Sequence, residues 1–506
     1  MSLASIEALT GTPALDTDVC IVGAGPAGIA LALRLDALQI RSVVLESGRA
    51  DDDSDTQALY RTDTDGIPYS GELTRRRRFG GSSNCWAGWC RPLDPQDFTA
   101  RAHIPHSGWP FDFAEYLEYL DAASTLCELG EPRFDLGYWR SRLEKPWDEQ
   151  PDIVDEQLRS GVFQHSPPTR FASRYRAELE RSSHSVVVLG ANVTRAHLAG
   201  RQAVHLIARN LQGAQLEVRA RYFVLACGGI ENARLLLSLN GTDRPALGNE
   251  YDQVGRHFTD HLIFHRQLDV FPTGSAIKAY VDMLPTQHPD RPHAVTPWLG
   301  MTTRIQEAER LSNTTLRFDR PQPLSDDEVD TRTVWNGLAS SQQRESDGSS
   351  IPERMTAVFI SEILPNPDSR VTLAEESDAL GMPRARITWR ISPADIDSIR
   401  RSAERIGRTL WRLGLARPGP VRVPDPDTLD NRSFWIGNHH YGTTRMSDNP
   451  RHGVVDKNGR VHSLDNLYVT GRSIFPTTGA ATPTLSIVML ALRLANHLEQ
   501  RFKVEH

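Results

Sequence analysis

The pattern of hydrophobic and polar positions predicts its clearest elements between residues 17 and 48. Residues 17–22 (TDVCIV) form a short apolar run that enters a glycine-rich turn, which is typical of a buried strand. Residues 26–40 follow with apolar side chains at helical spacing, and residues 42–46 (SVVLE) form a second apolar run. This order predicts one β-α-β unit with parallel strands.

The pattern of hydrophobic and polar residues changes twice beyond this unit. Residues 184–225 alternate as strands do and run into a helix, whereas residues 260–430 hold strand-like pieces separated by stretches rich in Pro and Asp. We interpret the second region as a largely antiparallel domain inserted into the first. The very polar residues 318–350 are interpreted as a long surface loop, with a lid or an oligomer arm as alternatives. The C-terminal residues 466–498 return to strand, loop and helix.

Composition places the chain among ordinary soluble proteins. Its 506 residues suggest two or three domains, and 39% hydrophobic with 24% charged residues excludes a disordered or fibrous chain. No run approaches the ~18 apolar residues of a membrane span. The net charge of −7 argues against a nucleic-acid-binding surface. Five cysteines make no disulfide framework, and the N-terminus lacks a secretory signal, so we expect a cytoplasmic enzyme with no membrane or nucleic-acid partner and no metal site.

A dinucleotide-binding signal lies in the first turn. Gly23, Gly25 and Gly28 form a GxGxxG motif between the predicted strand and helix, and Glu46 ends the next strand. The chemistry needs this set, because the glycines permit the tight turn, the approach of a pyrophosphate and close helix packing. Glu46 can accept hydrogen bonds from a ribose diol, which argues against NADP. The motif alone leaves NAD and FAD open.

Cys85 and Cys90 present an alternative chemistry. Their C-x4-C spacing is similar to the redox pair of flavin disulfide reductases. Those enzymes also need a second GxGxxG motif midway along the chain, and Gly228-Gly229 is followed by Ile230, Glu231 and Asn232 instead. Two packed thiols are therefore the favoured interpretation.

Several blocks together resemble the glucose–methanol–choline family of flavin oxidoreductases. Besides the β-α-β unit they are residues 80–86 (GGSSNCW), 107–110 (SGWP), 224–237 (VLACGGIENARLLL), 254–261 (VGRHFTDH), 365–373 (PNPDSRVTL), 438–446 (NHHYGTTRM) and 466–486 (NLYVTGRSIFPTTGAATPTLS). They follow the family order over most of the chain. Within the family, the sequences of these blocks most resemble those of bacterial members similar to pyranose and glycoside oxidases.

The resemblance implies an α/β fold. It implies a Rossmann-like FAD-binding domain assembled from separated segments, with an inserted α+β substrate domain that carries an antiparallel sheet. The boundaries we expect are 16–259 for the first part of the FAD-binding domain, including a flavin-covering loop at 79–92, then 260–437 for the substrate domain. Residues 438–506 would supply the catalytic loop and the rest of the FAD-binding domain.

The resemblance also implies the residues around FAD. We expect the cofactor to be bound by Gly23, Ala24, Gly25, Pro26, Gly28, Glu46, Ser47, Gly80, Gly81, Ser82, Asn84, Cys85, Trp86, Val193, Cys227, Gly228, Gly471, Arg472 and Thr484. Cys85 aligns with the histidine that anchors the flavin covalently in pyranose oxidases, so a cysteinyl link is a further hypothesis. The run Arg75–Arg78 is interpreted as a solvated loop, with a role at the pyrophosphate as the alternative.

The family's catalytic histidine falls on His439, three residues before Gly442. An imidazole suits the role of general base because its ordinary pKa lies near neutral pH. His440 is a second candidate. The family's next catalytic position, a His or Asn before a proline, is occupied here by Thr482, a departure that leaves open how the substrate oxygen is held.

These residues predict FAD-dependent oxidation of a small-molecule alcohol, with hydride transfer to flavin N5 and O2 or another electron acceptor. A sugar or glycoside hydroxyl is the favoured substrate. The alternatives are an oxidase or dehydrogenase for a non-sugar alcohol, and a flavin-binding protein with lost or altered catalysis.

Overall fold

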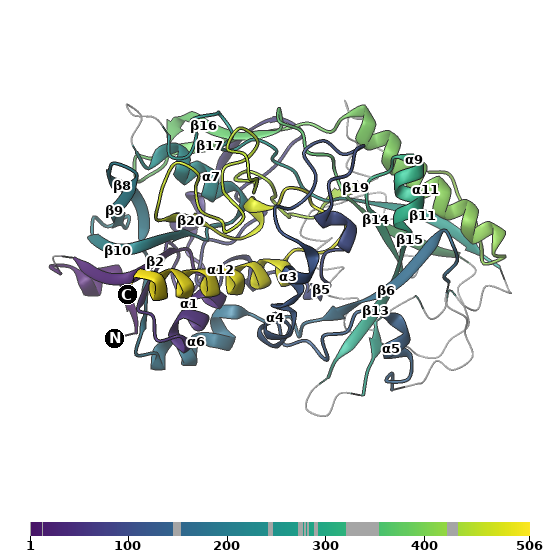
Figure 1. Cartoon of the computed structure of the whole chain (residues 1–506), viewed down its shortest axis with the longest axis horizontal. Coiled ribbons are helices and arrows are strands. Elements are labelled where there is room, and N and C mark those ends of the chain that lie inside the picture. Colours follow the sequence, from purple (N-terminus) through teal and green to yellow (C-terminus); the bar gives the residue numbers. More distant parts are fainter. Residues whose placement is uncertain are drawn as a thin grey trace.

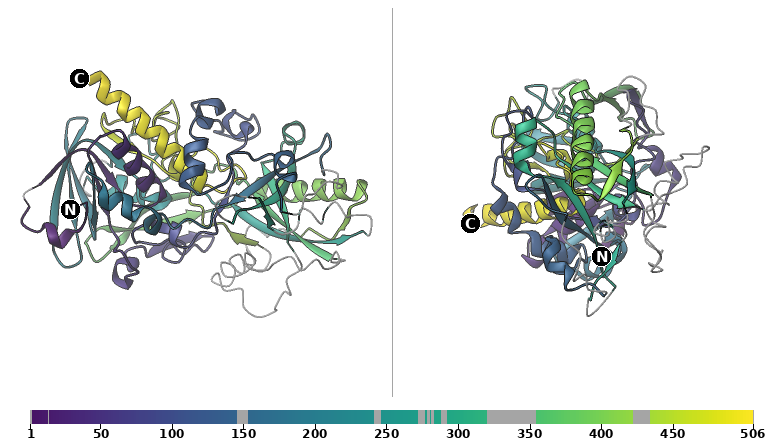
Figure 2. Two further views of the ribbon diagram at one scale, coloured as in Figure 1. Left: turned by 90° about the horizontal axis from the view of Figure 1, so that it is seen from below. Right: turned by 90° about the vertical axis from the view of Figure 1, so that its right-hand side faces the viewer.

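The computed structural model describes residues 2–12, 14–144, 153–240, 246–271, 277, 280, 283–287, 292–319, 354–421 and 434–505. Two large sheets lie side by side along the long axis of the molecule, with a small third sheet beside the first (Figure 1). Both termini lie at the end formed by the first sheet (Figure 2). The predicted surface loop at 318–350 falls, from residue 320 onward, outside the described residues.

The first sheet has eight strands, and most of them are parallel. Their order is β1 (Leu3–Ser5), β7 (Ser185–Leu189), β3 (Ser42–Glu46), β2 (Leu15–Val22), β10 (Gln215–Leu225), β9 (Gln202–Arg209) and β8 (Asn192–Ala199), and β20 (Leu467–Val469) pairs with the end of β10. Among these described strands only β9 runs against the others, in antiparallel pairings with β10 and β8. The carboxyl ends of the parallel strands therefore meet along one edge.

Helices bury this sheet. They are α1 (Pro26–Ala37), α6 (Phe171–Arg181), α7 (Gly228–Ser238) and α12 (Thr484–Glu505). α12 packs along α1, and Arg34 Nε donates to Asn496 Oδ1 at 3.2 Å. Strand β3 is buried along its whole length, which explains why its sequence is a continuous apolar run rather than an alternating one. The predicted strand–helix–strand order is observed as β2, α1 and β3.

The second sheet has nine antiparallel strands. Their order is β18 (Ala416–Pro418), β11 (Leu262–Val270), β15 (Arg354–Ser361), β14 (Thr314–Asp319), β13 (Ala294–Met301), β6 (Leu158–His165) and β5 (Trp89–Cys90), with β12 (Leu284–Pro285) on β13 and β19 (Phe434–Ile436) on β11. Helix α11 (Pro393–Arg412) packs against it, near α9 (Thr303–Glu309) (Figure 1). A Ser392–Asp395 capping box starts α11, and Ile399, Ala403, Ile406 and Leu410 form its buried stripe.

Two pairings differ from the sequence expectation. β5 and β6 precede residue 260 yet belong to the antiparallel sheet, and β16 (Arg370–Ser377) with β17 (Pro383–Trp389) forms a third sheet with β4 (Thr62–Gly66). Local patterning predicts that a segment is a strand but not which distant strand it pairs with. The antiparallel character predicted for the region after residue 260 is confirmed for β11, β13, β14 and β15.

Short elements complete the chain: η1 (Ile6–Leu9), α2 (Ser54–Ala58), η2 (Gly81–Asn84), η3 (Pro95–Phe98), α3 (Phe113–Leu117), α4 (Leu120–Leu126), α5 (Leu136–Arg140) and η5 (Arg472–Ile474), where η marks a 3₁₀ helix. In the described part of the chain, no helix has both the length and the apolar character needed to cross a bilayer.

Candidate active site

A large cavity lies between the two sheets. Its wall combines the loops that follow β2, β3, β10 and β20 with side chains of β5, β11, β14, β15 and β19. The first set lies at the carboxyl ends of parallel strands, where open α/β sheets bind their ligands. The second set lies on one face of the antiparallel sheet. The cavity therefore has a cofactor side and a substrate side.

The glycine turn forms an open cradle on the cofactor side. Gly23 adopts a φ of +103°, and a Cβ on Gly28 would lie 1.9 Å from the Gly23 carbonyl oxygen, so both positions require glycine. Gly25 is the N-cap of α1 and offers no side-chain cap, and a Cβ added there would meet no atom within 4 Å. The first N–H groups of α1 thus face empty space, as an anion site at a helix N-terminus requires.

Glu46 is buried beside this cradle. Its Oε2 accepts the backbone N–H of Ala24 at 2.7 Å, and its Oε1 accepts that of Gly48 at 2.7 Å. Burial raises the pKa of this carboxyl, against the effect of those two donors. Oε1 also accepts the Ser47 hydroxyl at 3.4 Å, whereas Oε2 keeps a lone pair beyond its backbone bond. The side chain lines the cavity, so Oε2 can accept a hydroxyl group there.

Most residues predicted for the cofactor line the cavity. They are Gly23, Gly25, Pro26, Glu46, Ser47, Gly81, Ser82, Cys85, Trp86, Val193, Cys227, Gly228, Gly471, Arg472 and Thr484. Four others support the wall from behind. Ala24 holds Glu46, Gly28 packs α1 against the turn, Gly80 takes a φ of +89°, and Asn84 Nδ2 donates to the carbonyl oxygens of Phe79 and Gly81.

The cysteines do not form the redox pair considered above. All five are free thiols. Cys90 hydrogen-bonds Cys127 instead of Cys85. The Cys85 thiol donates to Ser82 O at 3.4 Å, and burial raises its pKa. A covalent link through Cys85 stays a prediction.

The interpretation of Arg75–Arg78 as a solvated loop is wrong for two of its members. Arg75 and Arg77 are buried, and both pair with the buried Glu231, Arg75 Nη1 at 2.9 Å and Arg77 Nη1 at 3.5 Å. Glu231 is 156 residues further along the chain than Arg75, on α7, so no local pattern predicts the pairing. This cluster lines the cofactor side, where it adds positive charge near the cradle.

His439 lies in the cavity wall and contacts a second histidine. Its Nδ1 is 3.0 Å from His261 Nδ1, and His261 Nε2 is 3.0 Å from the carbonyl oxygen of Gly479. Burial, followed by the neighbouring His261 and Arg472, lowers the pKa of His439 well below its ordinary value. Burial also lowers the pKa of His261 to about 4. Both imidazoles are therefore neutral at physiological pH.

Asp260 anchors this pair through the backbone. Both of its carboxylate oxygens lie 2.8 Å from the backbone nitrogen of His439. In addition, Oδ1 accepts the backbone N–H of His261 at 2.7 Å, and Oδ2 accepts the Tyr69 hydroxyl at 2.6 Å. Burial raises the pKa of Asp260 to about 7. The Asp260 carboxyl thus holds the backbone of His439 in place. It changes its protonation state near neutral pH.

His440, the neighbouring candidate, also lines the cavity but has different partners. It is fully buried, its ring packs against Tyr69 and Phe258, and its Nε2 is 3.2 Å from Thr74 Oγ1. These contacts favour a packing role.

Thr482 lines the cavity as predicted, but its hydroxyl proton is already used. Its Oγ1 donates to the Trp89 carbonyl oxygen at 2.6 Å. The side chain can only accept a further hydrogen bond, so a direct contact with the substrate oxygen would make Thr482 an acceptor. Its donor bond instead fixes Trp89, which is itself part of the cavity wall.

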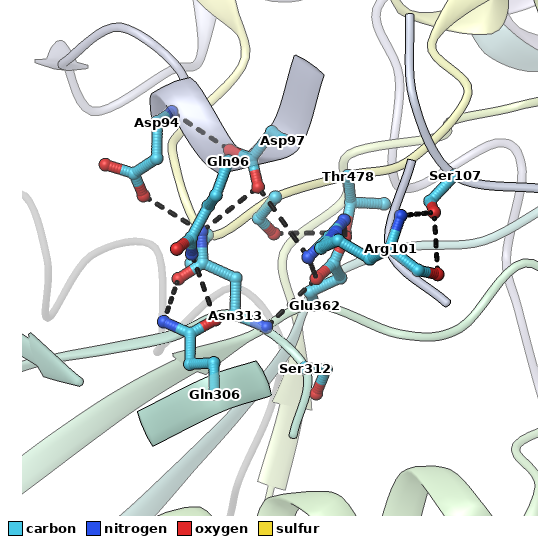
Figure 3. A network of polar contacts seen from close by, with 12 residues as sticks. Asp94, Gln96, Asp97, Arg101, Ser107, Gln306, Ser312, Asn313, Glu362 and Thr478 are labelled. Carbon is cyan, nitrogen blue, oxygen red and sulfur yellow. Dashed lines mark hydrogen bonds and ion pairs between the residues drawn. The ribbon is translucent and has the colours of Figure 1, made fainter. Parts of the chain in front are cut away.

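A buried polar network supports the loop that carries Gly479 and Thr482 (Figure 3). Arg101 forms two 2.7 Å bonds with Glu362, and the Asn313 amide group donates to Asp94 at 2.9 Å and Asp97 at 3.2 Å. Glu362 also accepts the backbone N–H of Gly479. The loop residue whose carbonyl His261 contacts is therefore held in place by an ion pair between Glu362, just beyond β15, and Arg101.

Sequence reasoning missed several of these residues as site members: Tyr69, Trp89, Asp260, His261, Glu362 and Arg317. Asp260 and His261 end the block at 254–261, which was noticed only as a family marker. The other contributions depend on contacts between distant segments.

The residues present fit FAD. An uncapped helix N-terminus with open space can hold the pyrophosphate, and Glu46 can hold a ribose. The buried Arg75 and Arg77 add positive charge on the same side.

Comparison with known proteins finds relatives among the oxidoreductases. Residues 365–491 match the family model described as GMC oxidoreductase. The chain is 22% identical to a 2-methyl-1,2-propanediol dehydrogenase of Mycolicibacterium austroafricanum, over 97% of this chain and 96% of that protein. It is 26% identical to a 6'''-hydroxyparomomycin C oxidase of Streptomyces lividus, over 95% and 92%. A C-glycoside 3-oxidase of Microbacterium trichothecenolyticum is 24% identical over 87% and 78%.

Solved structures show the same mixed α/β fold. A formate oxidase of Aspergillus oryzae RIB40, studied for its FAD modification, superposes with a TM-score of 0.54 at 15% identity, covering 98% of this chain and all of that one. A pyridoxine 4-oxidase from Mesorbium loti superposes with a TM-score of 0.53 at 20% identity, over 97% and 100%.

Proposed function

We propose that the chain is an FAD-dependent enzyme that oxidises a hydroxyl of a sugar or glycoside and that His439 takes the hydroxyl proton. The match of residues 365–491 to the GMC oxidoreductase model and the similarity to a dehydrogenase and two oxidases support this proposal. Bound FAD supplies the oxidant, since its N5 atom accepts the hydride from the substrate carbon. The relatives named for 6'''-hydroxyparomomycin C and for C-glycosides support the substrate class.

The proposal includes the domain organisation. Residues 16–259, with the covering loop at 79–92, and residues 438–506 form the Rossmann-like FAD-binding part, and residues 260–437 form most of the substrate part. The glycine cradle after β2 and the loops after β3, β10 and β20 support the first assignment. The antiparallel face of β11, β14 and β15 supports the second, with β5 and β6 added from the first segment.

The observation that carries the role of His439 is the contact chain from Gly479 through His261. A carbonyl oxygen only accepts, so His261 must carry its proton on Nε2. His261 is neutral, which leaves its Nδ1 as an acceptor, and His439 must then donate from Nδ1. In neutral His439 this leaves Nε2 as the free base. These contacts thus favour the His439 tautomer whose Nε2 can accept a proton.

The low pKa of His439 completes this role. An imidazole that stays neutral through the physiological range always offers its Nε2 lone pair. The Asp260 carboxyl holds the backbone of His439, so the ring keeps its place when the proton moves.

The test is anaerobic flavin reduction by a panel of sugars, glycosides, polyols, aminosugars and small diols. The account predicts bleaching of the bound flavin by a sugar or glycoside, and a second measurement with O2 and with an artificial acceptor then separates oxidase from dehydrogenase. Reduction only by a small diol would favour a non-sugar alcohol, as the 2-methyl-1,2-propanediol relative suggests. Bleaching by no alcohol at all would contradict the proposed oxidation and favour a flavin-binding protein.

His439→Ala and His440→Ala are the matched pair of variants. We expect His439→Ala to slow flavin reduction by about 10²–10⁴-fold, the usual range for a positioned acid–base group, with flavin content unchanged. His440→Ala should cost much less. The reverse order would show that the base is His440.

A further inference from the structure

The substrate side of the cavity contains one buried arginine with unused donors. Arg317, on β14, is 8% exposed and lines the cavity. Its Nη1 donates to Asp319 Oδ1 at 2.7 Å, and in the described part of the chain this is its one hydrogen-bonded or ion-paired partner. Its Nε and Nη2 groups are not sealed in by protein atoms. They are therefore available to a group inside the cavity.

The wall around Arg317 is otherwise uncharged. The described substrate-side wall is formed mainly by Trp89, Ile263, Val358, Ile360 and Trp435. Burial and then the Arg317 charge keep the pKa of the neighbouring His265 at about 3, so this ring is neutral. Asp319 is 30% exposed and lies outside the cavity wall, so water screens its charge. An anion on this side would meet an arginine that Asp319 engages only through Nη1, whereas an ammonium group would find no carboxylate in the described wall on this side.

Strand register gives the position of Arg317 relative to the reacting centre. Arg317, Val358 and His265 lie opposite one another on three adjacent strands. Thr315, Ile360 and Ile263 form the next row, and His261, which contacts His439, lies two residues beyond Ile263. The row of Arg317 is therefore four residues from His261, about 13 Å along the strand.

The cavity wall near Arg317 carries two indole rings, those of Trp89 and Trp435. The Arg317 guanidinium lies 4.4 Å from the centroid of the Trp89 ring. Trp89 is held at its carbonyl by Thr482. Indole faces and aliphatic side chains favour a flat apolar spacer, and the guanidinium fork favours a carboxylate.

We propose that Arg317 is an anion subsite, so that the substrate is a glycoside whose aglycone ring carries a carboxylate. The inference that this substrate is oxidised at a glycoside hydroxyl rests on the proposed function. The inference that it carries an anionic group rests on Arg317 alone. Cationic alcohols are poor substrates in this account.

The test compares three probes with one core: phenyl β-D-glucopyranoside, its 4-carboxyphenyl analogue and its 4-(aminomethyl)phenyl analogue. For the wild-type holoenzyme, kcat/KM should be highest for the carboxylate and lowest for the amine. Arg317→Gln should lower kcat/KM for the carboxylate by about 10- to 100-fold, the effect of losing a charge-assisted hydrogen bond, and change that for the neutral probe by less than about 3-fold. Arg304→Gln, at a 75% exposed arginine, should leave all three unchanged.

A binding measurement separates this proposal from the proposed function. The dissociation constant of each probe is taken from the perturbation of flavin absorbance, without turnover. Tighter binding of the carboxylate that Arg317→Gln abolishes supports the subsite even if no glycoside reduces the flavin. Equal affinity and kcat/KM for the carboxylate and the neutral probe would overturn the subsite while leaving glycoside oxidation standing. An equal loss for both probes in Arg317→Gln would also overturn it, because Arg317 would then act only by supporting Trp89.

Discussion

The two sides of the cavity are built in different ways. The cofactor side uses backbone, namely the Gly23–Gly28 turn and the loops that follow parallel strands, with Glu46 as its main buried acceptor. The substrate side uses isolated side chains that project from β5, β11, β14, β15 and β19. A backbone site depends on glycine and on strand ends, whereas a side-chain site depends on which strands pair. Substitutions on the first side should therefore affect cofactor binding, and those on the second should affect rate and selectivity.

Gly25→Val should produce the largest effect. The valine side chain would fill the open space before the N–H groups of α1 and weaken FAD binding by about 100-fold or more. Flavin absorbance per protein measures this after purification and dialysis. Gly137→Ala is a matched control, because its Cβ would meet only Asp135 at 3.9 Å, outside the cavity. Retention of flavin by Gly25→Val would remove the glycine turn from the cofactor site.

His261→Ala should slow flavin reduction by about 10- to 100-fold while leaving flavin content and KM nearly unchanged, because it frees the ring of His439. His261→Asn restores an acceptor near the position of Nδ1 and should recover part of the rate. Anaerobic stopped-flow measurement of flavin reduction in the wild-type protein and the two variants tests this prediction. Equal rates for the alanine and asparagine variants would mean that the second ring only fills space.

Thr482→Val should slow flavin reduction by about 2- to 15-fold, since it removes one neutral hydrogen bond, that to the Trp89 carbonyl. The loss should grow with bulky substrates that reach Trp89. A loss as large as that of His439→Ala would give Thr482 a direct role on the substrate oxygen, and no loss would leave it a packing residue.

Asp260 should give the smallest effect, visible as pH dependence. Its pKa of about 7 means that it becomes ionised as the pH rises through neutrality, and the carboxylate then binds the His439 N–H more strongly. The rate of flavin reduction should therefore rise by about 2- to 5-fold between pH 6 and 8. Asp260→Asn should lack this step. A step of the same size in the variant would assign it to another group.

The same contrast explains what the sequence could predict. The strand–helix–strand unit and the cofactor residues follow from apolar runs and glycines that are neighbours in the chain. His439 was located from its Gly-Thr block and does line the cavity. The partners of Arg75 and Arg77, the placement of β6 in the antiparallel sheet, and Arg317 all depend on contacts between distant segments. No local spacing carries that information.

The tautomer of His439 is the most direct test of the account. The nitrogen-15 spectrum of histidine-labelled protein at pH 7, assigned by loss of signals in His439→Ala, reports which ring nitrogen carries the proton. The account predicts a protonated Nδ1 and an unprotonated Nε2, with the two tautomers mixed in His261→Ala. A protonated Nε2, or an imidazolium with both nitrogens protonated, would contradict the role of His439 as the base.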